Sequence, residues 1–306
     1  MTMGEPSSAW KDEATVRHPR IKICGLRTPE AVDAVLRRGG PEVGFVHFAR
    51  SPRHLSLPDM VALRAYVGDR AAVAVVTVDP DDALLEAIRK VGDGYKPRVV
   101  FSSSMAVYGA PFPNAIPDDF NLTPLTSYGT QKAIIELMLA DYTRRGVLEG
   151  VGIRLPSIVV RPGKPNKAAS GFFSGIIREP LAGQEALLPV SETVVHTHAS
   201  PRSAVGFLIH GAELPREQIE PHINLTMPGV CCTVGEQIEA LRRVAGAKVA
   251  SRIRREPDPL VVRIVDGWPQ RLAGERATAL GFAVEQTFDE IIRVHIDEDL
   301  GGKFVM

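Results

Sequence analysis

Three side chains near the middle of the chain have the types and spacing needed to move a proton together with a hydride. Ser104 ends a short apolar run that begins near Arg98, and Tyr128 and Lys132 follow with the spacing Tyr-x-x-x-Lys. Residues four apart lie on one face of a helix, so the Lys132 ammonium is expected beside the Tyr128 phenol. A phenol with a pKa of about 10 is a weak base at neutral pH, and a nearby positive charge favours its phenolate form.

These residue types predict the oxidation of a hydroxyl group. A hydride leaves a carbinol carbon only if the hydroxyl proton leaves too, so a base must contact that oxygen. We predict that Tyr128 is this base, that Lys132 activates it and contacts the cofactor ribose, and that Ser104 orients the substrate. Because Tyr-x-x-x-Lys also occurs by chance on exposed helices, the prediction depends on the serine run and on the Val-Tyr-Gly that follows it.

The elements that must position these residues alternate between short apolar runs and amphipathic segments. This alternation predicts parallel strands joined by right-handed helical crossovers, as in an α/β protein. Strands are expected at residues 21–24, 43–46, 72–78, 98–102 and 151–155. Helices are expected at residues 29–38, 57–67, from 82 through 88, and at 127–144, 171–177, 203–212, 234–244 and 288–296. The helix at 127–144 carries Ile134, Leu137, Met138 and Tyr142 on one face.

Composition limits the classes of function. Lys+Arg and Asp+Glu both number 36, so no net positive charge is present to attract nucleic acid or an anionic membrane. The three cysteines, Cys24 and the pair Cys231-Cys232, have neither disulfide nor metal-ligand spacing. His196-x-His198 is interpreted as two residues on one face of a strand, so we expect no metal site. The expected location is the cytoplasm, with residues 1–20 as a disordered tail.

A glycine-rich turn is missing from the part of the chain that precedes the Ser-Tyr-Lys residues. No Gly-x-Gly-x-x-Gly or Gly-x-x-Gly-x-x-Gly occurs upstream of Val99. In dinucleotide-binding folds such a turn places the pyrophosphate at a helix N-terminus. We therefore expect the adenosine side of a dinucleotide to be held weakly, and activity to be impaired.

Residues from about 84 to the C-terminus resemble the extended short-chain dehydrogenase/reductase family. The resemblance rests on three stretches, which are residues 122–132, 161–173 and 198–202. It extends to a branch of the family that oxidises a four-carbon sugar acid with NAD. The resemblance implies that Ser102, Pro156 and Ile158 contact the cofactor together with Tyr128 and Lys132. It also implies an anionic sugar-acid substrate held by Lys164, Asn166, Lys167 and Arg202, and, by analogy, a homodimer.

Residues 21–85 resemble a different family, the phosphoribosylanthranilate isomerases. The resemblance rests on Ile-Lys-Ile-Cys-Gly-Leu at residues 21–26, Val-Gly-Phe-Val at 43–46 and Ser-Pro-Arg at 51–53. It implies part of a (β/α)8 barrel, with Cys24 at the position of the general base and Arg53 at a substrate contact. The acidic residue and the phosphate loops of that family have no counterpart here, so an isomerase activity is the alternative and not the first reading.

Together these observations predict a hybrid α/β chain. We expect a tail at 1–20, a partial barrel-like fragment at 21–88, a Rossmann-like catalytic core at 89–162 and a smaller substrate lobe at 163–306. The parallel Rossmann-like sheet would lack its own first strands, and the barrel-like units could dock as a substitute for them. The predicted function is an NAD-dependent dehydrogenase. The alternatives are the isomerase and an inactive remnant without either activity.

Overall fold

A computed structural model describes residues 22–37, 42–77, 96–163 and 168–306 of the 306-residue chain. Two compact units divide it, residues 1–93 and residues 94–306. The predicted tail at 1–20, the predicted helix from 82 through 88 and the predicted junction between the two resemblances lie outside the described residues. The further boundary predicted at residue 163 stays a prediction. Within the described residues, no helix has the length and apolar character required to span a bilayer.

The first unit contains a parallel sheet with strand order β1-β2-β3. Its elements in chain order are β1 (Lys22–Cys24), α1 (Pro29–Leu36), β2 (Glu42–His47), α2 (Leu57–Val67) and β3 (Ala72–Thr77). Both helices begin as the sequence predicts, because the hydroxyls of Thr28 and Ser56 accept hydrogen bonds from the first-turn backbone. Val32, Phe45 and Leu63 are buried in the core between helices and sheet.

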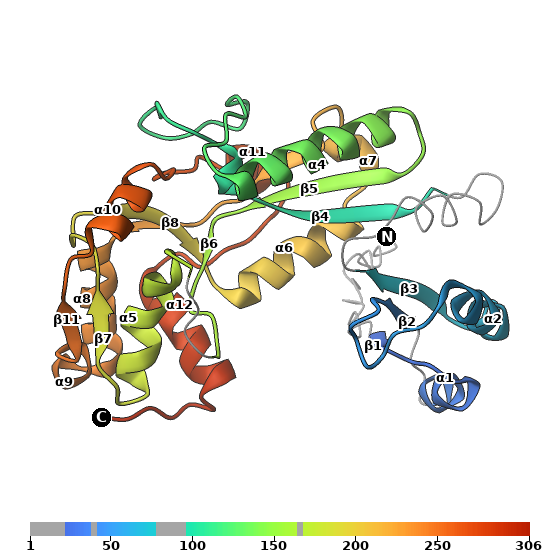
Figure 1. Ribbon diagram of the computed structural model, residues 1–306, viewed down its shortest axis with the longest axis horizontal. Helices are drawn as coiled ribbons and strands as arrows, with labels where there is room; N and C mark the ends of the chain where they lie inside the picture. Colours follow the sequence, from blue (N-terminus) through green and yellow to red (C-terminus); the bar gives the residue numbers. More distant parts are fainter. Residues whose placement is uncertain (1–21, 38–41, 78–95, 164–167) are drawn as a thin grey trace, which may run out of the picture. The chain divides into compact units, whose positions relative to one another are not determined.

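The second unit begins with a parallel sheet in the order β4-β5-β9 (Figure 1). Its strands are β4 (Arg98–Ser104), β5 (Glu149–Leu155) and β9 (Asn224–Thr226). The helices α4 (Ser127–Arg144) and α6 (Pro201–Glu213) cover opposite faces of this sheet. The glycines show this arrangement, since Gly150 of β5 packs against Leu139 of α4 while Gly211 of α6 packs against Ile153 of β5.

The remaining elements form a lobe around a second core. Its strands are β6 (Ser157–Ile158), β7 (Ala186–Leu188), β8 (Val195–Ala199), β10 (Val230–Thr233) and β11 (Ile253–Arg255). Its main helices are α5 (Gly171–Leu181), α8 (Val234–Ala245), α10 (Pro259–Asp266) and α12 (Phe288–Val294). Short helical segments complete the unit at η1 (Met105–Val107), α7 (Arg216–Ile219), α9 (Ala247–Ala250), α11 (Glu275–Ala279) and η2 (His295–Asp299).

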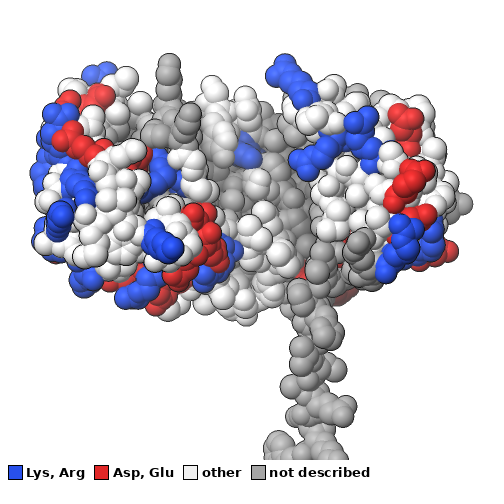
Figure 2. All heavy atoms as spheres, turned by 90° about the horizontal axis from the view of Figure 1, so that it is seen from below, with Lys and Arg blue, Asp and Glu red and all other residues white. Residues whose placement is uncertain are grey.

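The predicted helices of the second unit are confirmed, but the apolar face of α4 does not pack on the sheet. The face toward the sheet contains the small or polar residues Gly129, Ala133, Glu136 and Thr143 together with Leu139. Ile134, Leu137 and Met138 are 51%, 65% and 48% exposed. On the surface shown in Figure 2, basic and acidic side chains of the described residues lie side by side, as the zero net charge suggests.

Candidate active site

Ser104 lies where β4 meets the short helix η1. Its side-chain oxygen caps η1 by accepting a hydrogen bond from the backbone N–H of Ala106 at 3.1 Å. A hydroxyl that already accepts from the backbone still has its own proton to donate. The cap therefore holds the side chain in place and leaves it able to donate toward a substrate oxygen, which is the predicted role.

The first turn of α4 approaches η1 so closely that only glycine fits between them. A Cβ at Gly129 would lie 2.0 Å from the carbonyl oxygen of Ala106. Thr126 caps the same turn, since its hydroxyl accepts from the Gly129 N–H at 3.0 Å. Tyr128, the residue before Gly129, is therefore held against the segment that follows Ser104. Its side chain is 54% exposed, so the phenol is accessible to a substrate.

Lys132 lies between the phenol and the end of β4. Its ammonium donates to the backbone oxygen of Ser102 at 2.6 Å and lies 5.5 Å from the centroid of the Tyr128 ring. The same ammonium lies 4.7 Å from the centroid of the Phe101 ring. Partial burial lowers the pKa of Lys132. The structure thus brings together the lysine and the tyrosine of the predicted triad at the strand that ends in Ser104.

Two of the residues predicted to contact the cofactor, Ser102 and Pro156, lie at the carboxyl ends of two neighbouring parallel strands. Ser104 of β4 is the register partner of Leu155 of β5, so Pro156 follows at the same edge of the sheet. Pro156 is buried, whereas Ile158 in β6 is half-buried and pairs with Ala199. Open α/β sheets bind dinucleotides at this edge. The Lys132 ammonium has three donors, one of which Ser102 uses, so the site has the chemistry to bind a ribose.

Of the four residues predicted to hold the sugar acid, the structure describes Arg202. Arg202, near the start of α6, forms a salt bridge with Glu298 at 2.6 Å, and both side chains are about half exposed. Lys164, Asn166 and Lys167 lie outside the described residues. Their roles toward a carboxylate remain predictions.

A buried polar network beneath the site was not predicted from the sequence. Glu136 of α4 is fully buried and forms a salt bridge with Arg154 of β5 at 2.7 Å. Ser103 donates a hydrogen bond to the Glu136 carboxylate, and Arg154 donates to the hydroxyl of Tyr108 at 2.8 Å. Arg154 stands in an otherwise apolar strand and Glu136 follows Lys132 by one helical turn. Charges in such places are rarely buried unless they are paired, so these positions carried a usable signal.

The two histidines of β8 are structural. His196 and His198 are both buried, with ring centroids 5.3 Å apart, as expected for residues on one face of a strand. Burial lowers the pKa of His196 to about 4 and lowers that of His198 well below its ordinary value. His196 is bonded through Nε2 to the hydroxyl of Ser157 at 2.7 Å. In the described part of the chain, no three His, Cys, Asp or Glu side chains are grouped to hold a metal ion.

The Cys231-Cys232 pair lies in β10. Cys232 is buried, and burial raises the pKa of its thiol to about 12. Such a thiol is not a nucleophile at neutral pH.

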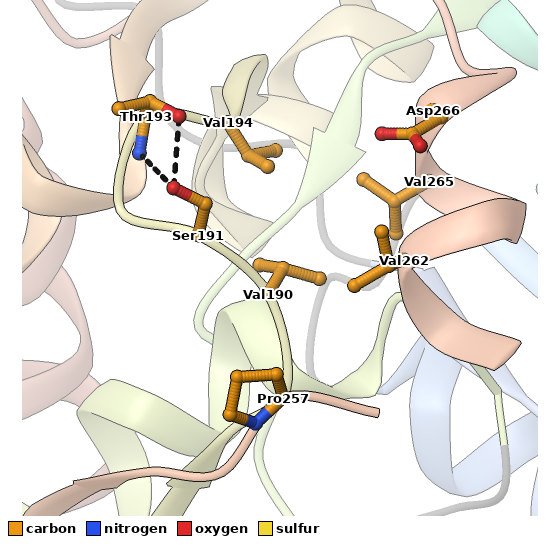
Figure 3. Close-up of a pocket in the computed structure, with 8 residues that line it drawn as sticks. All are labelled: Val190, Ser191, Thr193, Val194, Pro257, Val262, Val265 and Asp266. Atoms are coloured by element: carbon orange, nitrogen blue, oxygen red, sulfur yellow. Dashed lines mark hydrogen bonds between the residues drawn. The ribbon is translucent and has the colours of Figure 1, made fainter. Parts of the chain in front are cut away.

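A pocket of about 480 Å³ lies elsewhere in the second unit, and Figure 3 shows its lining. Val262, Val265 and Asp266 of α10 face the loop that carries Val190, Ser191 and Thr193. The Ser191 hydroxyl bonds to the Thr193 side chain at 2.8 Å, so these polar groups satisfy each other. The lining contains none of the predicted site residues.

In the first unit, the two residues of the alternative isomerase site are neighbours. Cys24 ends β1, and the Arg53 side chain packs over the adjacent Gly25, where a Cβ would lie 2.5 Å from the Arg53 Cδ. Gly25 has a φ of 83°, a conformation that suits glycine. The described strands of this unit are β1, β2 and β3, fewer than the eight of a complete barrel.

Comparison with known proteins decides the family. Residues 9–202 match the NAD dependent epimerase/dehydratase family. The chain belongs to this family. The match includes the residues that we compared with the isomerases as well as the Ser-Tyr-Lys residues. Membership in the epimerase/dehydratase family implies a nicotinamide cofactor.

Two relatives are named dehydrogenases, which supports an oxidoreductase. The D-erythronate dehydrogenase of Cupriavidus necator is 49% identical over 223 residues, which is 73% of this chain and 68% of that protein. The D-erythronate dehydrogenase of Haemophilus influenzae is 41% identical over 217 residues, which is 71% of this chain and 68% of that protein.

The chain also matches phosphoribosylanthranilate isomerases, the second family that its sequence resembles. An N-(5'-phosphoribosyl)anthranilate isomerase of Rhodopseudomonas palustris is 35% identical over 184 residues, which is 53% of this chain and 81% of that protein. Another, from Brucella canis, is 54% identical over 71 residues, or 23% of this chain and 32% of that protein. These matches support a chain that joins parts of two enzymes.

Solved structures confirm the α/β fold. The nucleoside-diphosphate-sugar epimerase of Agrobacterium tumefaciens has a TM-score of 0.71 and 51% identity, over 90% of this chain and 78% of that one. A GalE-like L-threonine dehydrogenase of Cupriavidus necator has a TM-score of 0.66 at 20% identity, over 91% of this chain and 99% of that one, and shows the fold alone.

Proposed function

We propose that this epimerase/dehydratase family member oxidises a secondary hydroxyl of a small anionic sugar acid, D-erythronate or a close analogue, with NAD. The observation that carries the proposal is the Lys132 ammonium, 5.5 Å from the Tyr128 ring centroid and bonded to Ser102 at the end of β4. This chain, which carries these residues, is 49% identical over 223 residues to a D-erythronate dehydrogenase.

The protein side chains have distinct roles in this reaction. Tyr128 takes the proton from the substrate hydroxyl, and the Lys132 ammonium lies beside its ring. Ser104, whose oxygen accepts from the Ala106 N–H, donates a hydrogen bond to the substrate oxygen and orients it. When bound, the nicotinamide cofactor supplies the group that accepts the hydride.

The residues available to hold that cofactor lie at its nicotinamide end. Ser102, Tyr128 and Lys132 would contact the ribose side, and Pro156 and Ile158 the nicotinamide ring. The missing glycine-rich turn weakens the adenosine side, so we expect NAD to bind in the millimolar range or weaker, on the order of 4 kcal/mol of binding free energy. Lys164, Asn166, Lys167 and Arg202 supply positive charge and amide donors suited to a carboxylate and hydroxyls.

The proposal is tested by adding NAD to the purified chain while its melting temperature is recorded, and by following NADH formation with D-erythronate. A ligand that binds the folded state raises the melting temperature. Tyr128→Phe is expected to lower turnover at least about 100-fold, because it removes the base but keeps the ring. Tyr142→Phe, on the same helix, is the matched control and should retain turnover.

One result would reject the dehydrogenase, and another would reject Tyr128 as its base. If millimolar NAD leaves the melting temperature unchanged and no NADH forms, the inactive remnant becomes the better account. If turnover is found but Tyr128→Phe retains it, another group is the base.

The isomerase remains the second candidate because the Arg53 side chain packs over Gly25, the residue that follows Cys24 at the end of β1. It is tested by complementation of a strain that lacks phosphoribosylanthranilate isomerase. Growth that disappears with Cys24→Ala would support the isomerase. Growth that persists with Cys24→Ala would mean that the isomerase activity does not come from this site.

We also propose a homodimer in the cytoplasm. The exposed face of α4, with Ile134, Leu137 and Met138, is a surface suited to a second copy of the chain. The cysteines of the described residues, Cys24, Cys231 and Cys232, are free thiols, which is common in a reducing compartment.

A further inference from the structure

The end of β4 is tied to α4 at two points just before Ser104. Lys132 donates to the backbone oxygen of Ser102, and Glu136, one turn further along α4, accepts from the hydroxyl of Ser103. Ser103 is 2% exposed, so this bond is shielded from water. Two consecutive residues of the strand are thus held by two residues on one face of the helix.

The segment after Ser104 is anchored to the same carboxylate through Arg154. The Arg154 Nη1 donates to the Tyr108 hydroxyl at 2.8 Å. Because the Tyr108 oxygen accepts this bond, its own proton is available for Thr226 of β9, whose hydroxyl lies at 2.6 Å. Ser104 therefore lies between Ser103 and Tyr108, which are both fixed by one buried ion pair.

The geometry of the ion pair suits a fixed orientation. Arg154 donates from Nε to Oε2 of Glu136 at 3.0 Å and from Nη2 to the same carboxylate oxygen at 2.7 Å, with a further contact from Nε to Oε1 at 3.1 Å. The planar guanidinium fork allows little freedom to the carboxylate it holds. A buried ion pair gains little stability over well-packed apolar residues, because desolvation offsets the attraction. The presence of the Glu136–Arg154 ion pair is better explained by the positions that it imposes on Ser103 and Tyr108.

We propose that Glu136 and Arg154 are positioning residues of the proposed dehydrogenase site, acting through Ser103 and Tyr108 to hold Ser104 beside Tyr128. This inference rests on the proposed function. Breaking the link is expected to slow turnover without weakening the binding of either substrate, and to loosen residues 102–108.

Ser103→Ala is the first test, because it removes the link and leaves the ion pair intact. Its kcat is expected to fall about tenfold, with KM for NAD and for D-erythronate changed by less than about twofold, since a displaced Ser104 affects orientation. Thr143→Ala is the matched control. Thr143 is another buried hydroxyl, on α4 itself, that donates to the backbone oxygen of Leu139 at 2.7 Å and accepts from the backbone N–H of Gly150 in β5 at 3.0 Å. The Thr143→Ala variant should lower the melting temperature by about as much as Ser103→Ala does, and it should retain the wild-type kcat.

A double-mutant cycle shows whether Glu136 acts through Ser103. The variant with both Glu136→Leu and Ser103→Ala is expected to have the same kcat as Glu136→Leu alone, because leucine cannot accept the Ser103 hydrogen bond and the second change removes a link already broken. Independent, multiplying losses in kcat would overturn the proposal. If Glu136→Leu does not fold, the comparison of Ser103→Ala with Thr143→Ala decides by itself.

Amide hydrogen exchange provides a readout that needs no turnover. Residues 102–108 are expected to exchange faster in Ser103→Ala and at the wild-type rate in Thr143→Ala. If the wild-type chain forms no NADH, the proposed function fails while exchange still decides the anchor. If Ser103→Ala has wild-type exchange in this segment, or wild-type kcat where turnover exists, the positioning role is rejected.

Discussion

Burial separates the titratable residues of this chain into reactive and structural groups. Lys132 is only partly buried, and its ammonium lies next to the accessible Tyr128 ring. His196 and His198, in contrast, are enclosed, and burial lowers the pKa of each. The same residue types would look equally reactive in the sequence. Their surroundings differ, and only Tyr128 and Lys132 lie where a substrate could reach them, as the proposed function requires.

The buried histidines are expected to make the fold sensitive to acid. The pKa of His196 is lowered from 6.5 to about 4, so between these values the unfolded chain binds a proton that the folded chain does not. The free energy of unfolding therefore falls as the pH falls through this window, by about 3 kcal/mol for His196 alone. His198 contributes in the same direction. Chemical denaturation between pH 7 and pH 4 measures this loss.

The substitution His196→Gln is expected to flatten that pH dependence. His222→Gln, at an exposed position, serves as the control and should leave it unchanged. An equally steep loss of stability in both variants would show that other groups cause the acid sensitivity.

At the scale of elements, one close contact decides whether the catalytic residues meet. Strand β4 brings Ser104 and helix α4 brings Tyr128, and Gly129 allows the first turn of α4 to approach the Ala106 carbonyl. The helix begins at the predicted residue because Thr126 caps it. The close approach of α4 to η1, however, depends on Gly129, because glycine has no side chain to fill the space between them.

Gly129→Ala is expected to push α4 away from η1. The added Cβ would lie 2.0 Å from the Ala106 oxygen, a distance that requires the backbone to move. We expect a loss of about 2 kcal/mol in the free energy of unfolding, together with loss of turnover. Urea denaturation and an NADH assay measure the two effects.

Gly206→Ala provides the contrast within helix α6. No atom lies within 4 Å of a Cβ at Gly206, which is exposed. This variant should gain about 0.5–1 kcal/mol from helix propensity and retain turnover. A Gly129→Ala variant as stable and active as Gly206→Ala would refute the close-contact argument.

At the scale of the whole molecule, the chain combines two α/β units with separate cores. Each unit carries residues of a different enzyme family, Cys24 and Arg53 in the first and Ser104, Tyr128 and Lys132 in the second. The exposed apolar face of α4 belongs to the second unit and predicts self-association there.

Leu137→Asp is expected to convert the proposed dimer into a monomer. Leu137 is 65% exposed on α4, and a charge buried at the centre of an interface should weaken the dimer at least about 100-fold. Sedimentation velocity measures the change. Val205→Asp, at a 55% exposed position on α6, is the control and should leave the dimer intact. A monomeric wild-type chain at micromolar concentration would contradict the proposal.

Much of the fold could be predicted from the sequence where elements are long. The helix at 127–144 and the strand at 151–155 were predicted, because their caps, breakers and apolar periodicity extend over several residues. Strands β7, β9 and β11 were missed. Each has three residues, too few for an alternating pattern to stand out.

The sequence by itself determined that Tyr128 and Lys132 lie on one face of a helix and that Ser104 ends a strand, because both follow from local helical and strand geometry. Only the tertiary structure decided that the apolar face of α4 is exposed and that Glu136 turns toward the sheet to meet Arg154. A side chain's partners across a sheet depend on contacts between residues far apart in the chain. Those contacts arise from the packing of whole elements, and no local pattern in the sequence encodes them.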